Sequence, residues 1–165
     1  MKRKIIFILP LLLALFLIGC SGYEPIFGSK KINFKVSDYS INGDKLLGKK
    51  IYSRFNNLSK SHKDQKNAKT ISFLIDVSKD KKASAKDSSG KILDYKISLE
   101  AKIEIYDYLT DKLLVNVNKI YFQGYSVQDQ ISETIKIENR TIEDLLNKIY
   151  QDLIIKLSQA IWYDY

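Results

Sequence analysis

The 165-residue chain contains a single cysteine, Cys20, and a single histidine, His62. One cysteine cannot form an intramolecular disulfide, and one histidine with one cysteine cannot supply the ligands of a usual zinc site. Two prolines and seven glycines exclude collagen-like and low-complexity sequence, and 45% apolar residues exclude a disordered chain. No G-x-S-x-G motif is present, and His62 lies in a polar, lysine-rich segment in which no plausible base, nucleophile or ligand partner for it stands out. We therefore expect one ordinary globular domain that is not an enzyme and holds no metal or other cofactor.

Arginine is also scarce, since it accounts for only three of the 27 basic residues. Arginine is the better bidentate ligand for phosphate, so its scarcity argues against a nucleic-acid partner despite a formal net charge of +8. Positive charge is concentrated between residues 45 and 91, where 13 basic and four acidic side chains lie. The densest part is a polar stretch, which we expect to be a loop, with Lys79, Lys81, Lys82, Lys86 and Lys91. It is either a solvated loop or an electropositive patch for an anionic partner such as lipid phosphates.

The N-terminus has the pattern of an export signal. Basic residues at positions 2–4 precede an apolar run at 5–18, which is too short to cross a bilayer as a helix. The following Leu17-Ile18-Gly19-Cys20 resembles the lipobox of bacterial lipoproteins, in which the cysteine thiol receives a diacylglyceryl group. This predicts a signal peptide at 1–19 and a stable lipid anchor on Cys20. The alternative is an ordinary signal peptide with a cysteine beside its cleavage site by chance.

The remaining chain alternates between strand and helix periodicity. Apolar residues recur at every second position in 31–36, 70–78, 94–105 and 113–117, and at helical spacing in 44–58 and 131–161. The order is strand, helix, three strands, helix. We predict an α+β fold in which a four-stranded, mainly antiparallel sheet is covered on one face by two helices, as a two-layer sandwich of order β-α-β-β-β-α. The domain is expected to span residues 31–165 and to follow a tether at 20–30.

Three details of this prediction depend on local irregularities. Ile120 and Phe122 are out of phase with the preceding strand, which predicts a bulge near Asn118. The C-terminal helix is either continuous or broken near residues 139–141. The polar sheet face is expected to expose tyrosines, of which the candidates are Tyr106, Tyr121 and Tyr125.

The segment Gly22-Tyr23-Glu24-Pro25-Ile26-Phe27-Gly28, directly behind the lipobox, resembles the start of the mature LPS-assembly lipoproteins (LptE, also called RlpB). The predicted element order resembles that family too. The resemblance implies an outer-membrane lipoprotein, anchored through Cys20, that faces the periplasm or lies inside a barrel lumen. It also implies a plug that helps to assemble an LptD-type β-barrel and delivers lipopolysaccharide to the outer leaflet. An auxiliary lipoprotein of another envelope lipid-transport complex is the alternative.

If the resemblance holds, the lysine-rich stretch from Lys79 to Lys91 is the candidate for contact with lipopolysaccharide. Lipopolysaccharide carries phosphates, which a cluster of ammonium groups attracts. The polar sheet face is equally compatible with solvent and with the polar lumen of a barrel.

Overall fold

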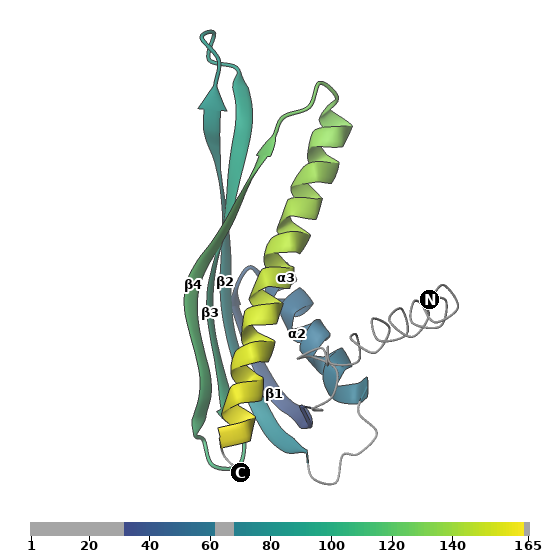
Figure 1. The fold of residues 1–165 in the computed structure, drawn as a ribbon, viewed down its shortest axis with the longest axis vertical. Coiled ribbons are helices and arrows are strands. Elements are labelled where there is room, and N and C mark those ends of the chain that lie inside the picture. The colour runs from purple at the N-terminus through teal and green to yellow at the C-terminus, as the bar shows by residue number, and fades with distance from the viewer. Residues whose placement is uncertain (1–31, 62–67, 164–165) are drawn as a thin grey trace, which may run out of the picture. The chain divides into compact units, whose positions relative to one another are not determined.

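The computed structural model of the protein describes residues 32–61 and 68–163. The predicted signal peptide at 1–19, Cys20, the tether at 20–30 and His62 lie outside these described residues. Six elements follow one another along the chain (Figure 1). They are β1 (Phe34–Gly43), α2 (Lys45–Ser61), β2 (Lys69–Lys86), β3 (Ile92–Asp107), β4 (Leu113–Ser126) and α3 (Ile131–Tyr163).

The four strands form one sheet in the order β1-β2-β3-β4. The pairs β2–β3 and β3–β4 are antiparallel, because short turns connect them, whereas β1 and β2 are parallel and are joined through helix α2. Both helices lie against the same face of this sheet (Figure 1). The predicted α+β sandwich, its element order and its mainly antiparallel sheet are confirmed.

The core lies between the sheet and the two helices. Alternate side chains of β2 and β3 are buried on the helix-covered face, as the period-two pattern predicts. Phe55 of α2 is at the centre of one aromatic cluster, with ring centroids 5.1 Å from Phe73 of β2 and 5.0 Å from Tyr150 of α3. This single side chain therefore joins both helices to the sheet.

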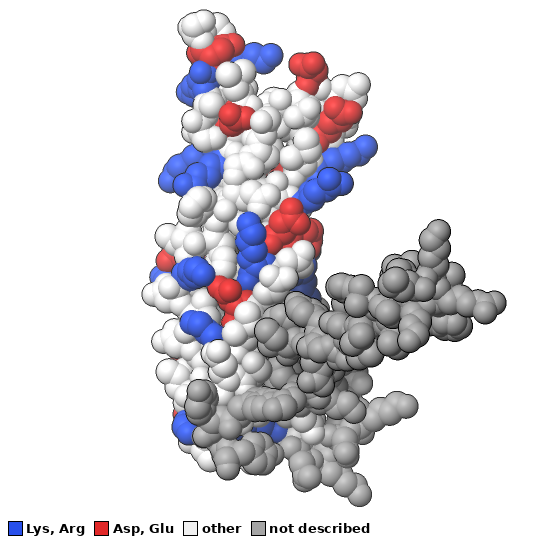
Figure 2. Space-filling view, in the orientation of Figure 1, with Lys and Arg blue, Asp and Glu red and all other residues white. Residues whose placement is uncertain are grey.

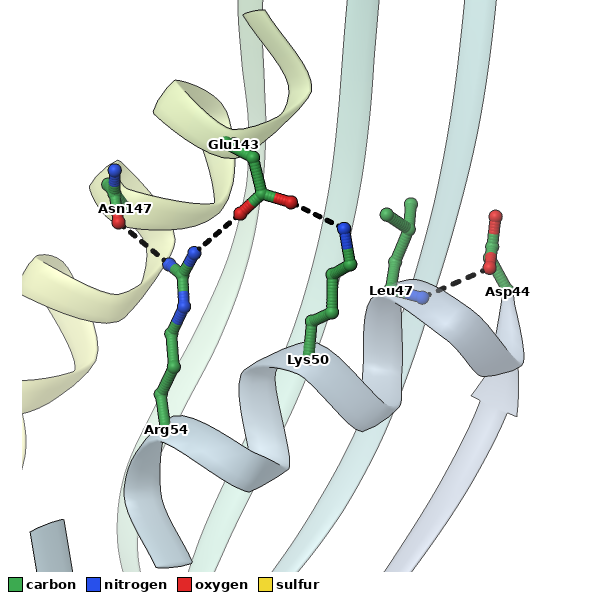
Figure 3. Close-up of polar contacts among 6 residues, drawn as sticks. All are labelled: Asp44, Leu47, Lys50, Arg54, Glu143 and Asn147. Carbon is green, nitrogen blue, oxygen red and sulfur yellow. Dashed lines mark hydrogen bonds and ion pairs between the residues drawn. The ribbon is translucent and has the colours of Figure 1, made fainter. Parts of the chain in front are cut away.

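The junction between β1 and α2 depends on two adjacent residues. Gly43 has a φ of +68°, and a Cβ atom there would lie 2.3 Å from the carbonyl oxygen of Val77, so only glycine fits. The next residue, Asp44, caps the helix, because its Oδ1 accepts hydrogen bonds from the backbone N–H groups of Leu46 (3.0 Å) and Leu47 (3.1 Å). Figure 3 shows the second of these bonds. The chain thereby turns from the sheet edge directly onto the sheet face.

Strand β2 corrects the expectation of a lysine-rich loop. It continues to Lys86 and pairs with β3 along the whole stretch, from Lys79 opposite Leu99 to Lys86 opposite Ile92. Only residues 87–91 form the connecting turn. The polar sequence hid the strand, because most of its side chains are exposed and therefore show no apolar alternation. Strand β1 is longer than predicted for the same reason, since residues 37–40 are exposed on an edge strand.

The predicted bulge near Asn118 is wrong. Strand β4 pairs with β3 in one continuous register from Val115 to Ser126, and the irregularity lies at the other end, between Ile105 and Tyr106. Ile120 and Phe122 break the apolar pattern because they lie on the uncovered face, where they are 58% and 59% exposed.

Two of the three tyrosines expected on the polar face are buried on the other one. Tyr121 and Tyr125 are only 6% and 7% exposed, and their hydroxyl groups reach carboxylates of α3. Tyr106 is half-buried, and its hydroxyl donates a hydrogen bond to Glu104. The question of helix continuity is also decided, since α3 is one helix of 33 residues, about 50 Å long.

Candidate functional site

The lysine-bearing end of β2 is an open sheet edge. Strand β1 pairs with β2 only as far as Gly43 opposite Val77. From Lys79 to Lys86, β2 has β3 on one side and no strand of the described residues on the other. Lysines on such an edge discourage pairing with strands of other chains. The positive charge of this segment therefore has a structural use that is independent of any ligand.

Lys81 is held in a cluster with Tyr95, Tyr125 and Glu138, which we call the Lys81 cluster. Its Nζ lies 2.6 Å from the Oε2 of Glu138 in α3 and 4.2 Å above the ring centroid of Tyr95. The Tyr125 hydroxyl donates to the same carboxylate oxygen over 2.8 Å, and the rings of Tyr95 and Tyr125 are stacked at 5.8 Å. The cluster connects three strands of the sheet to the N-terminal half of α3.

The electrostatics of the Lys81 cluster favour its charged form. Burial lowers the pKa of Lys81, but the Glu138 carboxylate and the Tyr125 hydroxyl outweigh it, so this pKa is raised overall. Burial raises the pKa of Glu138, and the hydrogen bonds from Lys81 and Tyr125, with the nearby charge of Lys79, lower it overall. Both partners of the ion pair are therefore charged at neutral pH.

Lys79 lies on the same sheet face as this cluster, and its charge acts on Glu138, but the other three lysines of the stretch do not join them in one patch. Lys82 points to the uncovered face and forms an exposed ion pair with Asp80 at 2.9 Å. Lys86 and Lys91 flank the β2–β3 turn, which Asp87 closes by accepting hydrogen bonds from the N–H groups of Ser89 and Lys91. Hydrogen bonds from Ser89 and Lys91, chiefly from the Ser89 hydroxyl, lower the pKa of Asp87. The five predicted residues are thus divided between two sheet faces and a turn.

Polar contacts also hold α3 along the outer strand β4. The Tyr121 hydroxyl donates to Asp152 over 2.7 Å, and Lys119 pairs with the same carboxylate at 3.0 Å. Burial and the Asp152 charge raise the pKa of Tyr121 strongly. Burial raises the pKa of Asp152, whereas the hydrogen bonds from Tyr121 and Lys119 lower it overall. These contacts join β4 to α3 at the edge of the core.

The two helices are joined by a small ion-pair network that the sequence pattern did not indicate (Figure 3). Arg54 of α2 donates to Glu143 and to Asn147 of α3, over 2.8 Å in each case. Lys50, one turn earlier on α2, donates to the other oxygen of Glu143. The spacing of Lys50 and Arg54 at i and i+4 is a detectable signal for a shared helix face, but their partners lie about 90 residues away.

The uncovered sheet face combines charged and apolar side chains. Phe122 is exposed, and the Nζ of Lys96 lies 4.0 Å from its ring centroid. Ile120 and Leu74 are exposed on the same face, the latter to 38%. Lys102 and Glu100 form an ion pair there at 3.1 Å. Figure 2 shows another side of the domain, in the orientation of Figure 1. There, basic and acidic side chains are interspersed instead of forming one basic patch.

Within residues 32–61 and 68–163, no group of three or more histidine, cysteine, aspartate or glutamate side chains could hold a metal ion. Neither helix of this described part is long and apolar enough to span a membrane. The described residues present three features at or near the surface: the lysine-bearing edge of β2, the Lys81 cluster and the uncovered sheet face.

No protein-family model matches the chain, and no curated protein matches it in sequence. Among solved structures, the chain is similar to rare lipoprotein B from Shewanella oneidensis, with a TM-score of 0.54 and 10% sequence identity. The match covers 78% of this chain and 100% of that one. The described domain has the fold of rare lipoprotein B. An uncharacterized lipoprotein B from Nitrosomonas europaea gives a TM-score of 0.49 at 11% identity, over 82% of this chain and 90% of that one. The fold that the family resemblance implies is confirmed by the match to rare lipoprotein B, whereas residues 22–28, which carry that resemblance, lie outside the described residues.

Proposed function

We propose that the protein is a non-enzymatic lipoprotein, anchored to the outer membrane through Cys20, that plugs and helps to assemble an LptD-type β-barrel. In this role it delivers lipopolysaccharide to the outer leaflet. The observation that carries the proposal is a lipobox followed by a domain with the fold of rare lipoprotein B. These two features are independent, because the first lies at residues 17–20 and the second in residues 32–163.

The geometry of the sheet supports a plug. The helices occupy one face, so the other face is available to a barrel wall. Its charged pairs match a polar lumen, and Ile120 and Phe122 supply apolar contact area on the outer strand β4. A double substitution, Ile120→Lys with Phe122→Lys, is therefore expected to weaken the contact without disturbing the core.

Capture of the full-length chain tests this proposal. A tagged chain should co-purify with a large outer-membrane β-barrel, and the Ile120→Lys, Phe122→Lys variant should capture less of it. The matched control is Leu46→Lys, because Leu46 is 75% exposed but lies on helix α2. Capture of an inner-membrane ABC complex instead would support the alternative, an auxiliary lipoprotein of another lipid-transport system.

The lipid anchor has a separate test. Mass spectrometry of the mature protein should find acyl chains on Cys20, and a Cys20→Ala variant should be lost from the membrane fraction. An unmodified thiol at Cys20 would overturn the proposal.

For lipopolysaccharide we propose that Lys79, Lys86 and Lys91 meet its phosphates, with Lys81 and Lys82 contributing only if their carboxylate partners are displaced. Neutralising the first three by Lys→Gln substitution should weaken lipopolysaccharide binding more than neutralising Lys81 and Lys82. Equal binding by both variants and the parent would assign the lysines to edge protection alone.

A further inference from the structure

The turn between β3 and β4 exposes three large apolar or aromatic side chains close together. Leu109 is 81% exposed, Tyr108 is 48% exposed and Leu113 is 45% exposed. Single exposed apolar residues are ordinary, but a leucine and a tyrosine at one turn form a small amphipathic tip. Tyrosine is a residue that membrane interfaces favour.

Several hydrogen bonds and an ion pair brace this turn. The Oδ1 of Asp107 accepts hydrogen bonds from the backbone N–H groups of Leu109 (2.9 Å) and Thr110 (3.2 Å). The Asp107 carboxylate also pairs with Lys69 at 3.3 Å, and the Tyr108 N–H donates to the carbonyl of Thr70 over 2.9 Å. The backbone that presents Leu109 is therefore already ordered before any contact, which lowers the entropic cost of binding.

The turn lies at the end of the sheet where the chain enters it. Phe34, the first residue of β1, is opposite Lys69, and Asp107 is opposite Ile71 in the next strand pair. The start of β1 and the β3–β4 turn are thus at the same end of the strands. Helix α3 begins at the opposite end (Figure 1), where Ile131 is 79% exposed.

The length of the preceding chain restricts which end can approach a bilayer. Only 12 residues lead from Cys20 to Ile32, a reach of at most about 43 Å. The 18 residues of β2 extend over roughly 56 Å from Lys69 to Lys86. If the β2–β3 turn rested on the membrane with the strands upright, the start of β1 would be too far away for the lipid on Cys20 to insert.

We propose that Tyr108 and Leu109 dip into the interfacial region of the bilayer that holds the Cys20 anchor, so that the strands stand away from the membrane surface. The partner is the lipid surface itself, with the tyrosine ring at headgroup level and Leu109 below it. This inference rests on the lipid anchor in the proposed function and does not require the barrel.

A site-specific fluorescence measurement tests the contact. Lipidation consumes the only native thiol, so Leu109→Cys introduces a unique site for an NBD label in the lipidated full-length protein. The labelled protein is reconstituted into phosphatidylethanolamine–phosphatidylglycerol vesicles with nitroxide-bearing lipids. The matched control is Ile131→Cys, because Ile131 has almost the same exposure at the other end.

We expect a blue shift and strong quenching at position 109, with neither at position 131. Quenching at both positions, at neither, or only at position 131 would overturn the proposal. A blue shift at position 109 on addition of a soluble protein, in the absence of vesicles, would overturn the lipid contact and indicate a protein partner for this turn. If the full-length parent chain without a label fails to float with the vesicles, both the lipid anchor and this inference are refuted. Failure to capture a barrel would refute the proposed plug but not this inference.

Discussion

Helix α3 is held to the sheet in two different ways along its length. Its C-terminal half buries Ile149, Leu153 and Leu157 completely, and Leu145 and Leu146 are fully buried just before the midpoint of the helix. Its first ten residues bury none completely and leave Ile131 and Ile135 exposed at 79% and 53%. They contact the sheet through the polar bonds of Glu138 and pack against the core with the partly buried Ile137. One continuous helix thus has a polar start of ten residues and an apolar C-terminal half.

This difference predicts unequal local stability. Each fully buried leucine or isoleucine contributes about 1.5–3 kcal/mol through burial, whereas a typical hydrogen bond contributes about 1 kcal/mol net. The first ten residues of α3 should therefore open in local fluctuations that require less free energy than unfolding of the whole domain. Four experiments examine this contrast.

The largest effect is expected from a cavity in the apolar half. Leu153→Ala should lower the free energy of unfolding by about 2–5 kcal/mol, because Leu153 is fully buried between the helix and the sheet. Urea unfolding followed by circular dichroism measures this loss. The matched control in the polar first ten residues is Ile135→Ala, which should change stability by less than about 0.5 kcal/mol. Similar losses for the two variants would show that the two parts of the helix do not differ.

The next effect concerns the Lys81 cluster. Glu138→Gln leaves the partly buried Lys81 ammonium without its charged partner, so the local opening of α3 should become easier by roughly 1 kcal/mol. Hydrogen exchange of the amides in residues 135–141 should accelerate about fivefold, with little change in the amides of residues 149–157. The control is Glu133→Gln, in the exposed first turn. Unchanged exchange in residues 135–141 would show that the Lys81 cluster does not stabilise the start of α3.

Acid should weaken the same contacts. Because the folded-state pKa values of Glu138 and Asp152 are lowered, their contribution to stability is present above the ordinary carboxyl pKa of about 4. It is lost as the pH falls through the lowered values, since the unfolded chain then binds more protons. The free energy of unfolding should therefore decrease between pH 6 and pH 3, and less steeply in Glu138→Gln. An equal slope in the variant and the parent would contradict this assignment.

The smallest effect is expected for an exposed lysine of the same strand. Lys82 and its partner Asp80 have side chains that are 78% and 55% exposed, so Lys82→Ser should change stability by less than about 0.5 kcal/mol. Lys81→Ser, one residue earlier, should cost more and should also accelerate exchange in the first half of α3. A larger loss from Lys82→Ser would mean that the uncovered face is more strongly coupled than its exposure indicates.

Much of the fold was predictable where burial is periodic. The stripe of Leu47, Ile51 and Phe55 predicts α2, and the alternation along β3 predicts a strand with one covered face. The lysine stretch was not predictable in the same way, because a strand with exposed side chains carries no burial pattern. Its structure comes from hydrogen bonding to β3, which depends on register and not on side-chain hydrophobicity.

The candidate site was likewise predictable in part: the sequence indicates single residues but not their partners. Single residues such as Lys81 stand out in the sequence, but their partners lie on other elements: Glu138 is 57 residues further along the chain. Tyr121 and Tyr125 were assigned to the wrong face because a single phase error reverses every side chain of a strand. Both side chains have polar tips, which face α3 carboxylates and so are compatible with burial.

By itself, the sequence determined the element order, the two-layer architecture and the positions of the main apolar stripes, because these follow from local periodicity. Only the tertiary structure decided the extent of β2, the division of its lysines between two faces and a turn, and the polar attachment of the start of α3. Those features depend on strand register and on contacts between residues distant in the chain, and the identities of neighbouring residues carry no information about either.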